Sequence, residues 1–257
     1  MNQTVQLMVT CLLDVLYPET GEAVLQVLGK IGLKVEFPSE QTCCGQPAFN
    51  AGMRSQARRM AEHTIRVFEK SAAPLVIPSG SCAAMLRHGY RELFREDRAW
   101  LVRAEKLADR AYEFTEYLVD ILGVSDVHAS YTGKLAYHAS CHLLRDLGVD
   151  RQPRDLLASI QDAELIELTG AQECCGFGGL FSLEYPEISA AMLQRKILNI
   201  QDSGADLVVS CDLGCVTHIN GGLHRQGQPS RAVHIAHILA SSGKKNPELI
   251  DFHIHLK

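Results

Sequence analysis

The sequence lacks the features of a secreted or membrane-spanning protein. No apolar run approaches the roughly 18 residues of a membrane span. Residues 1–7 form no positively charged leader and no small-residue cleavage site follows them, so we expect no secretory signal. A chain that is not exported stays in the reducing cytoplasm, where clustered cysteines indicate metal binding or catalysis more often than disulfides.

The chain also lacks the positive charge that nucleic acid requires. Its formal net charge is −5 and its sequence pI is about 6.1, so we expect no nucleic-acid partner. The densest group of arginines, between residues 54 and 66, is interleaved with Glu62 and Glu69, which predicts a solvated helix face. With 46% hydrophobic and 21% charged residues, the 257-residue chain is typical of a globular protein of one large or two small domains.

Motifs for nucleotide binding and for familiar catalysis are missing as well. No G-x-G-x-x-G follows a predicted strand, and the sequence contains no G-x-x-x-x-G-K-[ST]. The C-x₂-C-x₂-C-x₃-C-P run of ferredoxins is also absent. No Ser-His-Asp or Cys-His arrangement stands out as a nucleophilic site. If the protein takes part in redox chemistry, hydride transfer and long-range electron transfer must therefore come from partners.

Two pairs of adjacent cysteines, each followed by glycine, are the most distinctive feature present. They are Cys43-Cys44-Gly45 and Cys174-Cys175-Gly176. Adjacent α-carbons lie about 3.8 Å apart, against about 4.4–6.8 Å in a disulfide, so the members of a pair do not easily bridge to each other. Both thiols can, however, reach one compact metal centre. Gly176, Gly178 and Gly179 predict backbone lying close against a bulky ligand. A single pair could be core filling, but its repetition argues against that.

The spacing of the cysteines indicates a duplicated domain. Cys43 follows Cys11 by 32 positions, and Cys174 follows Cys141 by 33. Cys82 follows Cys44 by 38 positions, and Cys215 follows Cys175 by 40. We therefore predict a first half at residues 1–123, including connecting helices at 97–123, and a second half at 133–243. A linker at 124–132 joins them, and residues 244–257 form a C-terminal tail.

Strand and helix patterns alternate in each half, which predicts an α/β fold of two duplicated parallel-sheet βαβαβα units. The expected strands are 5–10, 34–37 and 74–77, then 134–138, 164–168 and 205–209. The expected helices include 22–32, 52–70, 153–160 and 186–202. Every cysteine cluster follows a strand, and ligands of open parallel sheets bind at the carboxyl ends of the strands. We therefore expect two groups of four thiols: Cys11, Cys43, Cys44 and Cys82, and Cys141, Cys174, Cys175 and Cys215.

Four thiols at one sheet edge admit three kinds of chemistry. An iron–sulfur cluster typically takes four cysteine thiolates, structural zinc also accepts four, and the thiols could instead carry out thiol–disulfide exchange. Zinc ligands usually come in short C-x₂₋₄-C knuckles, whereas these cysteines are widely spaced and their loops are rich in glycine. The residues therefore favour the cluster but leave all three alternatives open.

The duplicated pattern C-x₃₁-CC-G…C resembles the cysteine-rich CCG-domain family over about residues 5–240. That family includes the B component of heterodisulfide reductase and the iron–sulfur subunit of glycolate oxidase. The likeness is strongest to the small iron–sulfur subunits of bacterial L-lactate oxidation complexes. The residues that carry it are 9–12, 42–48, 78–82, 174–179 and 214–215.

The resemblance implies one [4Fe–4S] cluster in one or both halves, with Zn²⁺ as the alternative. It further implies an electron-transfer subunit of a multisubunit complex that oxidises L-lactate or another 2-hydroxy acid. The expected partners are the other subunits of that complex, one of them a ferredoxin-type iron–sulfur protein. The chain alone would then not be the complete enzyme. The alternatives are a zinc-stabilised scaffold or a thiol/disulfide reductase subunit of the heterodisulfide reductase B type.

The sequence departs from the family pattern at one position in each half. Complete family motifs end in C-x-x-C, but Ser79 and Asp212 stand where the first of those cysteines would be. Each half then has four candidate ligands, which argues against a five-cysteine noncubane cluster. Cys211 lies next to the expected position and is either a substitute ligand or a bystander thiol. His138, His142 and His218 lie near cluster cysteines, where we favour packing roles over coordination.

Overall fold

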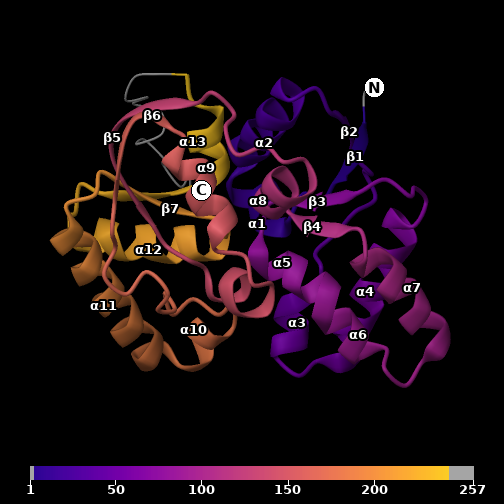
Figure 1. Ribbon diagram of the computed structural model, residues 1–257. Helices are drawn as coiled ribbons and strands as arrows, with labels where there is room; N and C mark the ends of the chain where they lie inside the picture. Colours follow the sequence, from indigo (N-terminus) through magenta and orange to yellow (C-terminus); the bar gives the residue numbers. More distant parts are fainter. Residues whose placement is uncertain (1–2, 243–257) are drawn as a thin grey trace.

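The computed structural model describes residues 3–242, and the predicted tail at 244–257 lies outside them. Two parallel four-stranded sheets form the core of the molecule, one in each half (Figure 1). The first runs β2-β1-β3-β4 and the second β6-β5-β7-β8, so the strand order is the same in both. The α/β prediction and the duplication are confirmed. The strands are β1 (Thr4–Leu7), β2 (Lys34–Glu36), β3 (Leu75–Ile77), β4 (Ala111–Glu113), β5 (Ser130–Tyr137), β6 (Gln161–Ile166), β7 (Leu207–Ser210) and β8 (Arg231–His234).

Short helices follow the strands and cover both sheets. In the first half they are α1 (Cys11–Leu16), α2 (Pro18–Lys30), α3 (Gln46–Asn50), α4 (Arg54–Phe68), α5 (Gly80–Ala84), α6 (Tyr90–Leu93), α7 (Arg98–Ala108) and α8 (Phe114–Glu116), with π-helical turns η1 (Met85–Gly89) and η2 (Tyr117–Ile121). In the second they are η3 (His142–Asp146), α9 (Arg151–Ala158), α10 (Phe181–Glu184), α11 (Pro186–Ser203), α12 (Leu213–Arg225) and α13 (Ile235–Ala240). No helix within residues 3–242 is long and apolar enough to cross a membrane.

Two strands were not predicted, and both are short. β4 lies within the segment 97–123 that was expected to be helical, and β8 follows α12 near the end of the described chain. β4 reads Ala-Tyr-Glu and β8 reads Arg-Ala-Val-His, so neither forms an apolar run that stands out in the sequence. β6 begins three residues earlier than expected, at Gln161, because it is an edge strand with exposed polar side chains.

The two halves pack against each other in a reciprocal way. Helix α2 of the first half packs on α13 of the second, and α9 of the second packs on α8 of the first. In the same manner α1 packs on α12, while η3 packs on α5. A Cβ added at Gly80 would lie 2.7 Å from Cβ of Leu143, so α5 and η3 approach closely only because residue 80 is glycine. One hydrophobic core includes residues of both halves, and the boundaries at 123 and 133 stay predictions.

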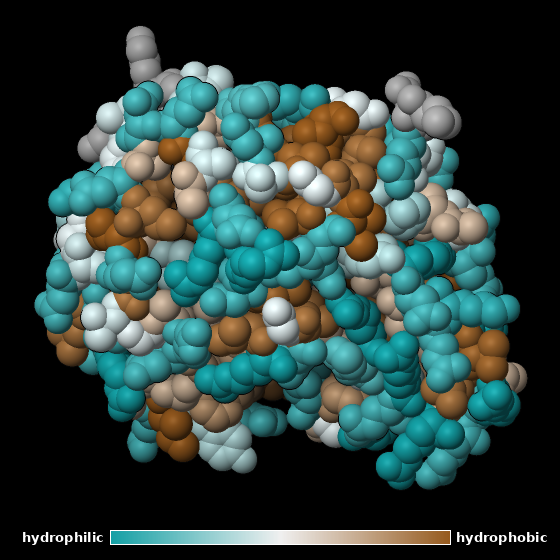
Figure 2. Space-filling view, in the orientation of Figure 1, coloured by the Kyte–Doolittle hydropathy of each residue, from teal (hydrophilic) through white to brown (hydrophobic). Residues whose placement is uncertain are grey.

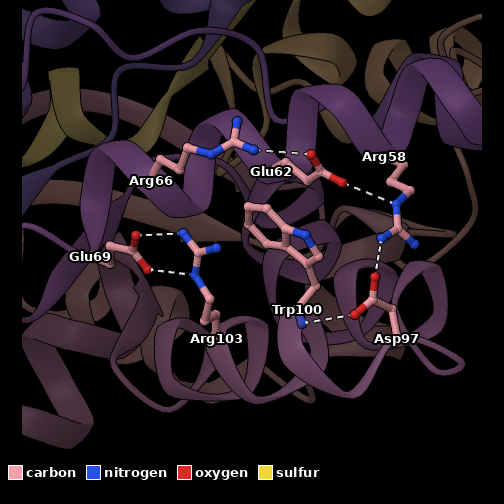
Figure 3. A network of polar contacts seen from close by, with 7 residues as sticks. All are labelled: Arg58, Glu62, Arg66, Glu69, Asp97, Trp100 and Arg103. Carbon is pink, nitrogen blue, oxygen red and sulfur yellow. Dashed lines mark hydrogen bonds and ion pairs between the residues drawn. The ribbon is translucent and has the colours of Figure 1, made fainter.

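An ion-pair network covers the face of α4 that was predicted to be solvated (Figure 3). Trp100, the one tryptophan of the chain, lies between the guanidinium groups of Arg66 and Arg103, 4.8 and 3.8 Å from its ring centroid. The ion pairs join Arg58 to Glu62 and Asp97, Arg66 to Glu62, and Arg103 to Glu69. Such half-exposed pairs contribute only about 0–1 kcal/mol each, so the network adds little to the stability of the contact between α4 and α7.

Candidate metal centre

Eight cysteines follow the carboxyl ends of the strands in both halves. In the first half, Cys11 begins α1 directly after β1, and Cys82 lies in α5 after β3. Cys43 and Cys44 lie in the loop between β2 and α3. The second half repeats this arrangement with Cys141 before η3, Cys174 and Cys175 after β6, and Cys215 in α12. All nine cysteines of the chain are free thiols.

All eight of these thiols line one cavity of about 160 Å³, which we call the cysteine cavity. The remaining lining comes from the surrounding loops and helices, including Gln46, Pro47 and Asn50 of α3. Gly178 and Gly179 line it from the second half, ahead of α10. Figure 2 shows the surface notched at its lower edge between the two halves, where α3 and α10 lie in Figure 1. The two groups of four thiols therefore share one space.

In each half, two of the four sulfur atoms lie close to each other. Sγ of Cys44 is 3.5 Å from Sγ of Cys82, and Sγ of Cys175 is 3.4 Å from Sγ of Cys215. These separations are far longer than the bond of about 2.05 Å in a disulfide. Cys44, Cys82, Cys175 and Cys215 are buried, whereas Cys11, Cys43, Cys141 and Cys174 are half-buried. Each half thus offers two deep and two shallower donor atoms.

One thiol in each half is held as a thiolate by its neighbours. Hydrogen bonds from Cys11 and Cys44, with a smaller contribution from the Gly45 backbone, lower the pKa of Cys43 to about 3. The equivalent bonds from Cys141, Cys175 and Gly176 lower the pKa of Cys174 to about 2. Donation to these thiolates, together with burial, raises the pKa of Cys11, Cys44, Cys141 and Cys175. Since the thiolate is the form that ligates metals, each half has one ligand already prepared.

The glycine after each cysteine pair sets the turn of the loop. Gly45 has φ +87° and Gly176 has φ +92°, a left-handed conformation that side chains other than glycine rarely adopt. A Cβ at Gly176 would also lie 2.7 Å from the carbonyl oxygen of Ser189 on α11. Gly176 lies outside the lining of the cysteine cavity, and its N–H donates to Sγ of Cys174 at 3.4 Å. Of the three glycines expected to face a ligand, the structure places Gly178 and Gly179 at the cavity and Gly176 behind it.

Ser79 and Asp212, which stand where the resemblance predicts a further cysteine in each half, bond to each other across the two halves. Oγ of Ser79 donates to Oδ2 of Asp212 at 3.2 Å, and the N–H of Ser81 donates to the same oxygen at 2.9 Å. Each residue also caps a helix: Ser79 accepts from the N–H of Cys82, and Asp212 from the N–H of Gly214. Both line the cysteine cavity, so the substitution exchanges two potential ligands for a polar contact that joins the halves.

We expect Asp212→Ala to destabilise the metal-free protein by about 2 kcal/mol, because it removes a helix cap and leaves the Ser81 N–H without its partner. Denaturant unfolding of Asp212→Ala, Ser79→Ala and the double variant measures this. The two changes should be less than additive, since each removes the same contact between the halves. Full additivity would show that the Ser79–Asp212 bond contributes nothing to stability.

Cys211 lies outside the cysteine cavity. It is fully buried, and burial raises the pKa of its thiol. Its thiol lies near Tyr137, Thr115 and the carboxyl of Glu113. The structure therefore brings together eight of the nine cysteines, and Cys211 is the one that it keeps apart.

The three candidate histidines have different surroundings. His138 is fully buried, and its burial lowers the imidazole pKa to about 3. His142 lines the cavity and pairs with Asp146 through Nδ1 at 2.6 Å. His218 is half-buried beside Phe177 and within 3.3 Å of the Ser189 hydroxyl. His138 has a ring nitrogen within 4.8 Å of the Sγ atoms of Cys175 and Cys215.

Lys196 is a site residue that the sequence did not reveal. Its side chain is 1% exposed, and its ammonium donates to the carbonyl oxygen of Gly170. Burial lowers its pKa, while Glu173, Cys175 and other thiols of the second half oppose that shift. A signal was present, since Lys196 lies between Leu193 and Ile197 on the buried stripe of α11. A buried cation there stabilises negative charge on the thiols of the second half.

The donor set suits a metal that prefers sulfur. Soft thiolate ligands select zinc, copper(I) and iron–sulfur centres over magnesium or calcium. Each half presents four thiols at a cavity, one of them already ionised, on loops that glycine allows to turn sharply. The residues therefore fit a thiolate-bound metal centre in either half.

Comparisons with known proteins agree with this arrangement. The model of the CCG cysteine-rich domain matches residues 5–87 and again residues 135–220. Lactate utilization protein A of an Exiguobacterium species is 42% identical over 242 residues, which are 94% of this chain and 98% of that protein. Lactate utilization protein A of a Geobacillus species is 44% identical over 237 residues, 92% of this chain and 99% of that protein.

A solved structure supports the fold alone. A hypothetical protein from Helicobacter pylori superimposes with a TM-score of 0.66 at 11% sequence identity. The match covers 98% of this chain and 52% of that one. With both domain matches and relatives of this identity over nearly their full length, the chain belongs to the CCG cysteine-rich domain family and contains two copies of its domain.

Proposed function

We propose that the protein is an iron–sulfur electron-transfer subunit of a multi-protein system that oxidises L-lactate. The observation that carries this proposal is the convergence of eight thiols, four from each half, on the cysteine cavity. The names of the relatives, lactate utilization protein A, supply the substrate. The letter A in those names supports a role as one component among several.

The arrangement of the thiols favours iron–sulfur clusters over zinc. Each group of four comes from three separate loops, whereas structural zinc usually takes pairs of cysteines from short knuckles. A [4Fe–4S] cluster takes four cysteine thiolates and, when bound, supplies transfer of single electrons. Cys11, Cys43, Cys44 and Cys82 would hold it in the first half, and Cys141, Cys174, Cys175 and Cys215 in the second.

The protein's own residues would set the properties of such a centre. The buried thiols Cys44 and Cys175 exclude water from the inner side of each site. The half-buried thiols Cys43 and Cys174 leave the outer side accessible. Lys196 adds a buried positive charge in the second half only. Electrons would then enter or leave on the outer side, where a partner docks.

The partners that we propose are the other subunits of the lactate-oxidising complex, including a ferredoxin-type iron–sulfur subunit. The chain carries no nucleotide-binding motif and no ferredoxin motif in its sequence, so those functions fall to the partners. We also propose a cytoplasmic location, because a reducing compartment keeps free thiols available for metal.

Zinc is the second candidate, and one observation favours it. Cys175, Cys215 and His138 have their ligating atoms within 4.8 Å of one another, and mixed cysteine–histidine sets are common in zinc sites. In that case the protein would be a zinc-stabilised scaffold.

Anaerobic purification of the tagged chain from its own cells, followed by a lactate-dependent dye-reduction assay, tests the proposal. We expect the assembly to reduce the dye with lactate and the isolated chain to be inactive. Assemblies rebuilt with Cys175→Ser should lose activity, while those with Cys211→Ser keep it. Oxidation of lactate by the isolated chain would refute the carrier role. Preference of the assembly for glycolate would refute only the choice of lactate.

A further inference from the structure

The two halves are not chemically equivalent at the position directly after their central strands. The N–H of Met8 donates to the carbonyl of Val76 at 3.0 Å, and the N–H of His138 donates to the carbonyl of Val209 at 2.9 Å. These matching bonds between neighbouring strands show that Met8 and His138 occupy the same place in the repeat. Both side chains are fully buried. Where the first half has a thioether, the second therefore has an imidazole.

The hydrogen bonds of His138 define its tautomer. Nδ1 lies 3.1 Å from the carbonyl oxygen of Ala171, which can only accept, so Nδ1 carries the hydrogen. Nε2 then holds a lone pair, and it is buried without a hydrogen-bond partner among the described residues. Buried polar atoms nearly always have a partner, so an orphaned acceptor needs an explanation.

The imidazole of His138 lies next to two cluster thiols. The ligating atoms of His138, Cys175 and Cys215 all lie within 4.8 Å of one another, the one set of this kind among residues 3–242. Metal-binding histidines usually donate their other ring N–H to a carbonyl or carboxylate, which is the arrangement seen at Ala171. The ring is thus oriented as a ligand would be.

The neighbouring helix strengthens the difference between the halves. The glycine of each cysteine pair packs on a methionine, Gly45 on Met60 of α4 and Gly176 on Met192 of α11. Lys196 therefore occupies the position that Thr64 has in the first half, and within residues 3–242 the second half alone has a buried cation beside its thiols.

We propose that Nε2 of His138 is a metal ligand in the second half, in place of one of the four thiolates there, which makes that half a mixed sulfur–nitrogen site while the first half binds metal through thiolates alone. The inference rests on the proposed function insofar as a metal must be bound, and it holds for an iron–sulfur centre or for zinc. Replacing thiolate by imidazole ligands raises the reduction potential of iron–sulfur centres. The second-half centre is therefore the one reduced first.

Pulsed EPR of the reduced protein, labelled with ¹⁵N-histidine, tests coordination directly. The background is Cys44→Ser, which leaves only the second-half centre. We expect a strongly coupled histidine nitrogen, and its loss in His138→Met, which installs the residue that the first half has at this place. Circular dichroism confirms that the variant folds. A reduced centre with only weakly coupled nitrogen would overturn the proposal, because Nε2 would then merely accept a hydrogen bond from a thiol.

The same variants separate this inference from the proposed function. If the purified protein contains zinc, the iron–sulfur function fails, and X-ray absorption at the zinc edge then reports the ligands. His138 would still be supported as a ligand if zinc has one nitrogen ligand in the Cys44→Ser protein and only sulfur ligands once His138→Met is added. An all-sulfur shell in both would overturn it, and a chain that binds no metal would overturn both proposals.

Discussion

Replacing Cys175 with serine should remove the metal from the second half and leave the first half loaded. Cys175 is a deep donor, 2% exposed and 3.4 Å from Sγ of Cys215. A serine hydroxyl is a poor ligand for metals that prefer sulfur. Cys211 cannot replace it, because Cys211 is buried outside the cysteine cavity. We expect iron and acid-labile sulfide per chain to fall by about half when each half holds one cluster.

Matched variants make this prediction specific. Cys44→Ser is the equivalent change in the first half and should leave the second-half centre intact. Combining it with Cys175→Ser should remove bound metal altogether. Cys211→Ser, which alters a buried thiol away from the cavity, should leave the metal content unchanged. Full metal content in Cys175→Ser, or its loss in Cys211→Ser, would contradict the assignment of ligands.

Glu113→Gln should stabilise the metal-free protein at pH 8 and do so much less at pH 5. Glu113 is fully buried at the end of β4, where its carboxyl accepts from the N–H groups of Thr115 and Glu116. Burial raises its pKa from 4.5 to about 8. The unfolded chain therefore loses this proton at a lower pH than the folded protein does. Below pH 4.5 the carboxyl is protonated in both states and does not lower the free energy of unfolding. As the pH rises toward 8, ionisation in the unfolded chain alone lowers the free energy of unfolding.

Glutamine keeps an oxygen that can accept the two capping bonds but cannot ionise, so the variant avoids this loss. Denaturant unfolding under reducing conditions should show the difference between the variant and the original protein growing with pH, by on the order of a few kcal/mol. His138, His234 and His237, whose pKa values burial lowers, contribute in the opposite direction below about pH 6.5. These histidines are present in both proteins, so their contributions cancel in the difference between the variant and the original protein. An equal difference at pH 5 and pH 8 would refute the buried-acid interpretation.

From the cysteine repeat it could be predicted which four thiols of each half gather at one edge of its sheet. Cys11, Cys43, Cys82 and their counterparts follow strands, and parallel strands end at one sheet edge. The sequence could not predict that both groups share one cavity, because this depends on how the halves pack. That packing arises from contacts such as Gly80 with Leu143, which leave no periodic signal in the sequence.

Residues whose surroundings are unusual for their type could not be predicted from the sequence either. Lys196 belongs to a residue type that is normally exposed, yet α11 buries it beside the cysteine loop. Ser79 and Asp212 were recognised only as missing cysteines, and their bond across the halves required the structure. His138 was expected to have a packing role, because its orphaned Nε2 is visible only once the neighbouring strand and loop are in place.

The identity and stoichiometry of the bound metal decide whether this protein is an iron–sulfur electron carrier. The chain, purified without oxygen from cells grown on lactate, should contain iron and acid-labile sulfide in equal amounts, about four of each per loaded site. It should also absorb broadly near 400 nm and lose this absorption when reduced. Colourless protein with stoichiometric zinc and no sulfide would contradict the account of this protein as an electron carrier.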